Sequence, residues 1–355
     1  MIGLFCVGAI FLLLYYILFL NHNYFVKRGV PHHKAVPILG NAAPYVLQKR
    51  HISEVLQELC DAFPKHGFFG YFDFWCPVYM VKDVELVKKI CIKDFNHFVN
   101  HRTQFSAEHD PLFANSLFSM NDSRWRNMRS VLSPAFTGTW NDDDLAAQCT
   151  VFLFAGFETV ATLTSFMAHE LAINSTVQAK LRAEVDATGA KLNGRRPTYE
   201  IIQEMTYLDM VVTETLRKWP PVPFLDRRCT KPYLLEDLDG SSVQLQPGDS
   251  IWIPTTAIMR NPKYFPQPEK FDPERFSVEN RGTIDPNAFI SFGVGPRNCI
   301  GSRFALMETK TTFFYLLSRF TIESGPKTQH PLEIKTSSIT MQAKNGFWVR
   351  FRKRS

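Results

Sequence analysis

The stretch that decides the fold is Phe292-Gly-Val-Gly-Pro-Arg-Asn-Cys-Ile-Gly301. Glycines stand six and four positions before Cys299 and two positions after it. Glycine takes positive φ and lets the backbone pass close to a flat group, so this spacing predicts a tight loop around the thiol. A helical pattern begins just after Cys299, which places the thiol near free N–H groups and the positive end of a helix dipole. Both effects favour the thiolate, the form of cysteine that binds metals.

Three roles are open to a thiolate at Cys299. A nucleophile needs a base, and no His lies nearby in the sequence. A zinc site needs further ligands, and no second Cys stands close by. A single thiolate as axial ligand of haem iron fits best. The other six cysteines, at positions 6, 60, 76, 91, 149 and 229, are dispersed and form no CxxC pair, as expected in a reducing compartment.

This loop resembles the haem-binding loop of the cytochrome P-450 family, the haem-thiolate monooxygenases. The matching residues are Phe292, Gly295, Arg297, Cys299 and Gly301. The resemblance extends over nearly the whole chain, although not continuously. It implies a mostly α, α+β fold that binds haem b, iron protoporphyrin IX, with Cys299 on the iron and Phe292 and Gly295 in the cofactor loop.

A pair of charged residues also matches the family. Glu214-Thr-Leu-Arg217 is an i, i+3 pair, which by itself is more often a surface ion pair. In the resembling family this pair is buried and joined by a later arginine, here Arg275. A buried Glu with two Arg must be fully hydrogen-bonded, so its expected role is to fix the geometry of the Cys299 loop.

Trp125 and Arg129 are one helical turn apart, so they project from the same face. A bare WxxxR is usually a core residue plus a surface charge. The resemblance instead implies a grip on the haem propionates, with Arg227 and Arg297 as further donors. Arginine suits this role because its planar fork binds a carboxylate through two bonds at once.

Ala155-Gly-Phe-Glu-Thr159 lies within the longest helical pattern, residues 144–172, which is apolar over more than half its circumference. Such a helix is expected to be buried on most sides. A helical glycine costs ~1 kcal/mol relative to alanine, and a buried Glu needs a partner, so the segment predicts a site. The resemblance implies that Gly156 leaves room for dioxygen, Thr159 hydrogen-bonds it and Glu158 helps to relay protons. A tolerated glycine and a satisfied Glu are the alternative.

The beginning of the sequence predicts a membrane anchor. Residues 1–20 contain no charged side chain and would span about 30 Å as a helix, the thickness of the hydrocarbon core. Basic residues follow this stretch and none precedes it, so the rest of the chain is expected to be cytoplasmic. Residues 21–40, with Pro31 and Pro37, are expected to form a hinge. We expect a single anchor in the endoplasmic reticulum membrane.

The match to the family breaks at one place. Only eight residues separate Phe136 from Leu145. Family members have several helices between the helix of Trp125 and the oxygen-binding helix. We therefore expect residues 41–355 to form a haem-binding catalytic domain that lacks several central helices, with a junction near 137–144. Apolar surface around the haem should then be uncovered.

The composition fits a folded enzyme: 45% of residues are hydrophobic, 21% are charged, and the net charge of +6 is spread thinly, which argues against nucleic acid as a partner. The resemblance implies insertion of one oxygen atom from dioxygen into a lipophilic small molecule, with electrons from an NADPH-dependent flavoprotein reductase. General similarity suggests the insect microsomal detoxifying type. The expected reductase surface is an exposed basic cluster of Arg124, Arg126, Arg303 and Lys310.

Two other functions remain open at this point. A chain without its roof could be a non-catalytic or unstable haem-binding family member. A haem-thiolate isomerase or dehydratase is the third option, although such enzymes need no oxygen-activating threonine and Thr159 is in place.

Overall fold

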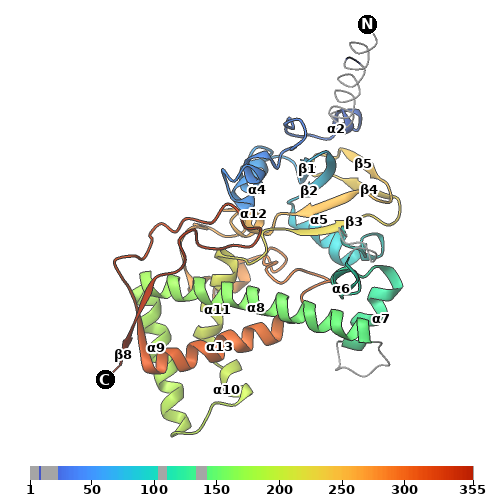
Figure 1. Cartoon of the computed structure of the whole chain (residues 1–355). Helices are drawn as coiled ribbons and strands as arrows, with labels where there is room; N and C mark the ends of the chain where they lie inside the picture. Colours follow the sequence, from blue (N-terminus) through green and yellow to red (C-terminus); the bar gives the residue numbers. More distant parts are fainter. Residues whose placement is uncertain (1–7, 9–22, 103–109, 133–141, 355) are drawn as a thin grey trace. The chain divides into compact units, whose positions relative to one another are not determined.

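The computed structural model describes residue 8 and residues 23–102, 110–132 and 142–354. All of the expected anchor except Gly8, and most of the expected junction near 137–144, lie outside these residues. The chain divides into two compact units (Figure 1). The first comprises Met1–Arg102 and Phe224–Ala257, and the second comprises Thr103–Pro223 and Ile258–Ser355.

The first unit is built on a mixed four-stranded sheet with the order β1-β2-β6-β3. Strands β1 (Phe68–Asp73) and β2 (Cys76–Val81) are antiparallel, β2 runs parallel to β6 (Ser250–Ile253), and β3 (Leu225–Arg228) is antiparallel to β6. A separate hairpin pairs β4 (Tyr233–Glu236) with β5 (Ser242–Leu245). The helical segments are α2 (Tyr24–Lys27), α3 (Ala43–Val46), α4 (Ile52–Asp61), α5 (Val84–Lys88), a π-helical turn (Lys89–Lys93) and a 3-10 turn (Phe95–His97), with α12 (Thr255–Met259) at the boundary between the units.

Helix α4 begins at a capping box, in which His51 accepts from the Ser53 N–H and Glu54 accepts from the His51 N–H. Its apolar face packs against one face of the sheet, where Phe69, Tyr71 and Trp252 are buried. Residues 23–40 also belong to this unit. Phe25 is fully buried and its ring lies 5.0 Å from that of Phe72.

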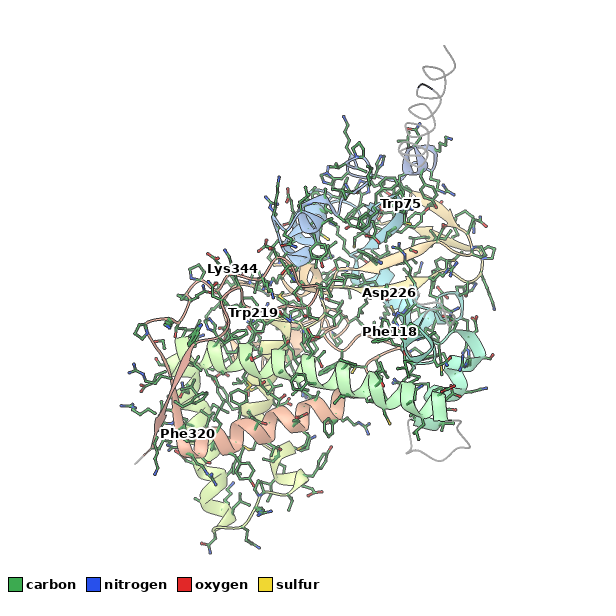
Figure 2. All side chains as sticks on the ribbon, viewed as in Figure 1. Trp75, Phe118, Trp219, Asp226, Phe320 and Lys344 are labelled. Atoms are coloured by element: carbon green, nitrogen blue, oxygen red, sulfur yellow. The ribbon has the colours of Figure 1, made fainter. Side chains whose placement is uncertain are left out.

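The second unit is mainly helical. Its elements are α6 (Pro111–Ala114), α7 (Asp122–Leu132), α8 (Asp142–Ile173), α9 (Ser175–Leu192), α10 (Tyr199–Gln203), α11 (Thr206–Lys218), 3-10 turns at Pro273–Phe276 and Arg281–Thr283, α13 (Ser302–Arg319), and the antiparallel pair β7 (Phe320–Ser324) and β8 (Val349–Lys353). One buried cluster joins α8, α9, α11 and α13, with Leu171, Leu181, Leu216 and Phe313 among its members. Trp219 stacks on Phe166 with centroids 4.6 Å apart and donates to Glu170 (Figure 2).

Helix α8 changes character along its length. Its second half, from Val160, joins the buried cluster through Leu163, Met167 and Leu171. In its first half Leu153 and Phe157 are 68% and 77% exposed. The prediction that this helix is buried on most sides is therefore wrong for most of the first half. Among its described residues Ala147 and Gln148 are buried, and the Leu117 N–H donates to Gln148, whereas Leu153, Phe154 and Phe157 are exposed.

The exposed half of α8 fits the expectation that apolar surface is uncovered where family helices are missing. Within the described residues, Asp143–Ile173 is the helix that passes a length and composition test for crossing a membrane. Buried core helices of soluble proteins pass the same test, and the second half of α8 is such a helix.

Candidate functional site

Cys299 lies at the end of a closed loop in the second unit. The Cys299 N–H donates to the Phe292 carbonyl over 2.8 Å, and the Asn298 N–H donates to the Gly295 carbonyl over 3.0 Å. Gly293 and Gly295 both have a φ of +74°, as the glycine spacing predicts. The side chain of Phe292 packs against the buried cluster of the second unit. The loop is therefore anchored to the core at one end and presents the thiol at the other.

The third glycine of the motif lies beside the thiol. Gly301 has a φ of −87°, so positive φ is not what requires glycine there. A Cβ atom at Gly301 would lie 4.0 Å from the Cys299 sulfur, an ordinary van der Waals contact, so a side chain at this position would border the thiol. Helix α13 begins at the next residue, with Gly301 as its N-cap.

The protonation of the free thiol differs from the expectation. Burial of the sulfur raises the pKa of Cys299, although the residue as a whole is exposed, and the Gly301 N–H and Arg129 only partly oppose this rise. The helix start is therefore not enough to make the metal-free thiol a thiolate. A metal ion deprotonates the thiol that coordinates it, so ligation itself supplies the missing stabilisation.

The structure brings Trp125 and Arg129 of α7 to this loop. The Arg129 guanidinium donates to the Asn298 amide oxygen over 3.0 Å. The Arg297 guanidinium lies 4.2 Å above the centre of the buried Trp125 ring. Three of the four arginine and tryptophan residues predicted to hold propionates thus gather around the residues next to Cys299.

Arg297 also ties this loop to the turn before α7. It donates to the carbonyl oxygens of Phe118 and Met120 over 3.3 and 2.6 Å. Phe118, marked in Figure 2, has an exposed side chain. The Arg297 guanidinium therefore donates part of its N–H groups to backbone carbonyls, and these bonds fix the position of the guanidinium.

Arg227, the fourth predicted propionate ligand, lies on β3 in the first unit. Its side chain is buried and donates through Nη1 to the Asp226 carbonyl over 2.7 Å, while Nε has no hydrogen-bond partner among the described residues. It also opposes the rise that burial causes in the pKa of Cys91. Against the effect of burial, the positive charge of Arg227 also helps to lower the pKa of Asp226, so the guanidinium is not an unpaired charge, and its Nε–H remains as a donor for an anionic group.

Gly156 and Thr159 lie on the open half of α8. A Cβ atom at Gly156 would meet no described atom within 4 Å, so the described residues leave space beside the helix there. The Thr159 hydroxyl donates to the Ala155 carbonyl over 2.6 Å. Its oxygen retains acceptor capacity, and the proton becomes available when this bond within the helix opens.

Glu158 is exposed, contrary to the expectation that it is buried, because the neighbouring part of α8, with Leu153 and Phe157, is itself exposed. It does have partners: the Thr340 hydroxyl and the Gln342 amide donate to its Oε1 over 2.7 and 3.2 Å. No motif in the sequence marks Thr340 or Gln342, which stand more than 180 residues from Glu158.

Glu214 and Arg217 form a fully buried pair on α11. Two parallel bonds of 2.7 and 2.9 Å join the guanidinium to the two carboxylate oxygens. Arg217 also donates to the carbonyl oxygens of Met259 and Pro268 over 3.0 and 2.7 Å.

Arg275 completes this cluster. Its Nε lies 3.4 Å from Glu214 Oε1, and the Asp272 N–H donates to the same oxygen over 2.9 Å. The Arg275 guanidinium also donates to the carbonyls of Pro266 and Gln267. The carboxylate is thus saturated, and the two arginines hold residues 259–275 against α11.

One member of the expected reductase surface is misplaced. Lys310 is buried and pairs with Asp209 over 2.6 Å, so it offers no charge to a partner. Arg124 pairs with Asp144 over 2.9 Å while remaining half-exposed. Arg126 and Arg303 are exposed, as predicted.

The residues of the second unit fit a flat, mostly apolar cofactor that carries a metal. An exposed cysteine offers one soft ligand, and arginines stand beside it. Phe304, three residues after Gly301, is 70% exposed, and the open half of α8 offers Phe154 and Phe157. Large exposed aromatic groups of this kind are typical of surfaces that bind apolar partners.

Comparison with known proteins gives consistent matches. The family model for cytochrome P450 matches residues 30–140 and 137–350, two segments that meet where we expect the junction. The chain is 33% identical to Probable cytochrome P450 9f2 of Drosophila melanogaster, over 94% of this chain and 96% of that protein. It is 31% identical to Cytochrome P450 9e2 of Blattella germanica, over 99% and 98%. With Cytochrome P450 6j1 of Blattella germanica the identity is 27%, over 96% and 95%.

The alignments also contain the expected gap. The first covers 498 positions, whereas the chain has 355 residues, so at least 143 positions (498 minus 355) lie opposite a gap in this chain. The two ends of the relatives are therefore matched, and a long internal part of them has no counterpart here.

Proposed function

Because the chain belongs to the cytochrome P450 family, whose members are in general haem-thiolate monooxygenases with haem as their cofactor, we propose that it inserts one oxygen atom from dioxygen into a lipophilic small molecule. The observation that supports this most is the loop that presents Cys299 beside Trp125, Arg129 and Arg297. Haem would supply the reduction of dioxygen and the transfer of one of its oxygen atoms.

Each residue of the chain would have a distinct task in this reaction. Cys299 would bind the haem iron through its sulfur, and Gly301 would place no side chain beside that sulfur. Arg129, Arg297 and Arg227 would pair with the cofactor carboxylates, and Trp125 would steady Arg297 through its ring. Phe292 would fix the loop on the core.

Protons would reach the reacting oxygen from α8. Glu158 would hold a proton at its carboxylate, with Oε1 oriented by Thr340 and Gln342. The Thr159 hydroxyl would pass a proton onward after leaving the Ala155 carbonyl. Gly156 would leave space for dioxygen next to this hydroxyl.

The finer setting of this activity is also part of the proposal. The apolar residues 1–20 would anchor the chain in the endoplasmic reticulum membrane with the catalytic part facing the cytoplasm. Electrons would come from an NADPH-dependent flavoprotein reductase. Similarity to insect relatives supports a xenobiotic, detoxifying role.

A second candidate function rests on the bare half of α8. A chain whose Leu153, Phe154 and Phe157 face solvent could bind haem without turnover, or fold poorly. An isomerase or dehydratase is favoured by no observation, since Thr159 stands in the open part of α8.

The carbon-monoxide difference spectrum of the reduced full-length protein separates these functions. A thiolate-shifted Soret band, followed by substrate-dependent oxygen consumption, is expected for the monooxygenase. The band without turnover would favour the non-catalytic haem binder. A chain that incorporates no haem would contradict the enzymatic proposal.

Replacing Thr159 by alanine is expected to uncouple electron use from oxidation. Removing one hydroxyl costs little packing, so haem incorporation should survive. Product formation should fall on the order of 10²-fold, the low end of what a positioned proton donor contributes. Electrons from NADPH would then reduce dioxygen to hydrogen peroxide or water without oxidising the substrate. The measurement is the amount of NADPH consumed per product formed.

The matched control is Thr164→Ala. Thr164 also donates to a carbonyl of its own helix, that of Val160, over 2.9 Å. Its loss should leave coupling unchanged, and Thr159→Ser should restore most of it. Equal coupling in Thr159→Ala and the parent would make Thr159 a packing residue. If the parent chain shows no turnover, the same series belongs in a chimera that carries the missing helices of a relative.

Charge reversal at Arg126 and Arg303 is expected to slow reduction by the flavoprotein reductase about tenfold at low salt, because steering by exposed charges changes association rates by ~10–10³. The difference should fade as salt rises, since the Debye length falls from ~10 Å at 0.1 M to ~3 Å at 1 M. Stopped-flow reduction of the haem measures both.

The control for this effect is Lys344→Glu, an exposed lysine elsewhere in the second unit, marked in Figure 2. It changes the net charge by the same amount per site and should leave the rate unaltered. Lys310 is not a suitable site, because its reversal would break a buried pair. Identical rates for the Arg126 and Arg303 variants and the parent across the salt range would exclude this surface.

A further inference from the structure

Strand β8 has a strongly basic sequence, Val-Arg-Phe-Arg-Lys, and in the described part of the chain one of its edges pairs with no other strand. We propose that this edge, together with the pocket at its start, binds an extended acidic peptide segment of a partner protein. The proposal concerns a surface remote in sequence from the Cys299 loop and does not depend on the proposed monooxygenase activity.

The register of the hairpin shows which backbone groups are open. The Arg354 N–H donates to the Arg319 carbonyl over 2.9 Å. Because hydrogen-bonded residues alternate in an antiparallel ladder, the backbone N–H and C=O groups of Arg352 and Arg350 also point toward β7. The N–H and C=O groups of Val349, Phe351 and Lys353 therefore point away from β7.

The other edge of the hairpin is satisfied differently. Opposite Phe351, Ile322 exchanges two hydrogen bonds of 2.9 and 2.6 Å with the Gln178 side chain. This contact confirms that Ile322 and Phe351 are not a hydrogen-bonded pair, and it closes the edge of β7. Among the described residues no strand pairs with the open edge of β8. An open edge is a template for one more strand.

Charge decides which peptide would fit this edge. Arg352 pairs with Glu323 and Arg354 pairs with Asp186, over 2.8 and 2.6 Å. Lys327, Arg350 and Lys353 have no ion-pair partner among the described residues, which leaves three positive charges in excess. Residues 334–355 contain neither Asp nor Glu. An acidic strand would be attracted, and a basic strand would be repelled.

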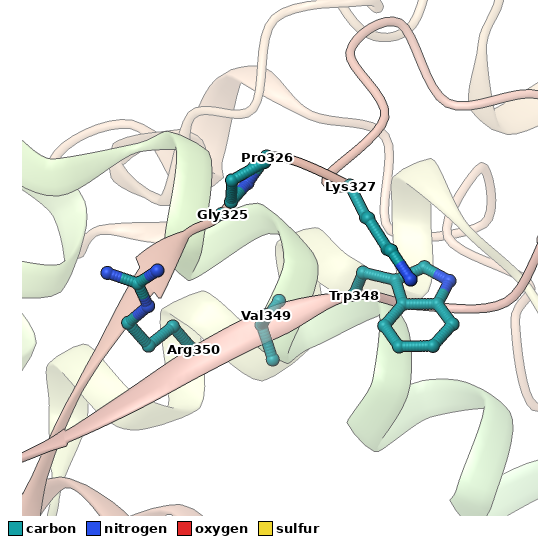
Figure 3. A pocket seen from close by; sticks show the side chains of 6 residues that line it. All are labelled: Gly325, Pro326, Lys327, Trp348, Val349 and Arg350. Atoms are coloured by element: carbon teal, nitrogen blue, oxygen red, sulfur yellow. The ribbon is translucent and has the colours of Figure 1, made fainter.

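The pocket at the start of β8 offers a place for one apolar side chain of the peptide (Figure 3). It measures about 390 Å³ and is lined by Gly325, Pro326, Lys327, Trp348, Val349 and Arg350. Trp348 is 51% exposed, and the Lys327 ammonium lies 4.7 Å from the centre of its ring. The indole N–H donates to the Asn345 carbonyl, so the ring is held in place while its face stays accessible.

A peptide fits these features better than the two other occupants. An anionic lipid headgroup could pair with the positive charges, but it could not hydrogen-bond to the alternating N–H and C=O groups of the edge. A second copy of β8 could hydrogen-bond to the backbone groups. It would, however, place Arg350, Arg352 and Lys353 next to the same basic residues of the other copy, and like charges repel.

The test is a fluorescence-anisotropy titration of the haem-loaded full-length chain with a fluorescein-labelled peptide of alternating Glu and Val. We expect saturable binding that weakens with salt and is accompanied by quenching of Trp348 fluorescence. Arg350→Glu combined with Lys353→Glu should weaken binding about tenfold or more through the association rate. Lys344→Glu reverses a single exposed charge elsewhere in the second unit and should bind as the parent does.

The backbone part is tested without altering the protein. A peptide N-methylated at alternate residues loses the N–H groups on one edge. One methylation pattern should abolish binding, and the pattern on the opposite edge should leave it intact. Phe351→Pro, which removes an outward N–H and no ladder bond, should act like the disruptive pattern, whereas Phe351→Thr should not.

Three results would overturn the proposal. Equal binding of both methylation patterns would exclude strand addition. Equal binding of a peptide of alternating Lys and Val would exclude charge recognition. Binding to phosphatidylserine vesicles, or self-association in sedimentation, without any binding of the acidic peptide would assign the surface to a membrane or to a second copy.

Discussion

Cys299→Ala is expected to abolish the thiolate-type spectrum of the reduced, carbon-monoxide-bound protein. The Cys299 sulfur is the soft ligand at the end of a loop that is held closed by the Phe292 carbonyl and fixed on the core by the Phe292 ring. Alanine leaves those contacts in place, so the secondary structure measured by circular dichroism should be unchanged. The loss should therefore be confined to the spectrum and to bound haem.

Cys149 provides the matched control for this experiment. It is the other exposed thiol among the described cysteines and lies on the open half of α8. Cys149→Ala should keep the spectrum, and the same holds for the buried thiols of Cys60 and Cys91. A thiolate-type spectrum that persists in Cys299→Ala and disappears in Cys149→Ala would show that the ligand has been assigned to the wrong residue.

The sequence predicts the elements whose pattern is local and misses those that depend on distant packing. Helix α13 (Ser302–Arg319) matches the helical pattern that begins just after Cys299 in the sequence. Helix α9 (Ser175–Leu192) is missed because it buries few apolar residues, Leu181, Val185 and Leu192, within 18 residues. Strand β1 (Phe68–Asp73) is missed because it is buried on both faces and does not alternate.

The residues around Cys299 are predictable in type but not in their contacts. Trp125 and Arg129 share a helix face by spacing alone, whereas the bond from Arg129 to Asn298 joins residues 169 positions apart. Lys310 is the instructive failure. A lysine on a predicted helix is usually exposed, and only the fold reveals that Asp209 makes its burial tolerable.

The open half of α8 links the gap in the alignment to the stability of the chain. A helix of 32 residues that exposes large apolar side chains such as Leu153 and Phe157 in its first half makes fewer apolar contacts than a helix buried along its whole length. The stability of the second unit then depends more heavily on the contacts that remain around α11, and the buried Glu214 cluster is among the strongest of these.

Arg217→Met is accordingly expected to destabilise the second unit by ~3–5 kcal/mol, the range found when one partner of a buried ion pair is removed. Glu214 would remain buried with only Arg275 and the Asp272 N–H, and the Met259 carbonyl would lose its donor. Since domains are stable by only about 5–15 kcal/mol, haem incorporation should fall sharply. Urea unfolding followed by circular dichroism and the yield of thiolate-type spectrum measure the two effects.

Two comparisons make this prediction specific to the buried charge. Lys180→Met removes an ion pair of similar length, 2.8 Å to Glu274, whose partners are 62% and 42% exposed, so its loss should be ~1 kcal/mol or less. The double variant Glu214→Leu with Arg217→Met leaves no unpaired carboxylate and should be less destabilised than Arg217→Met alone. If the double variant were the less stable of the two, the hydrogen bonds from Arg217 to the backbone, rather than its pairing with Glu214, would hold residues 259–275 on α11.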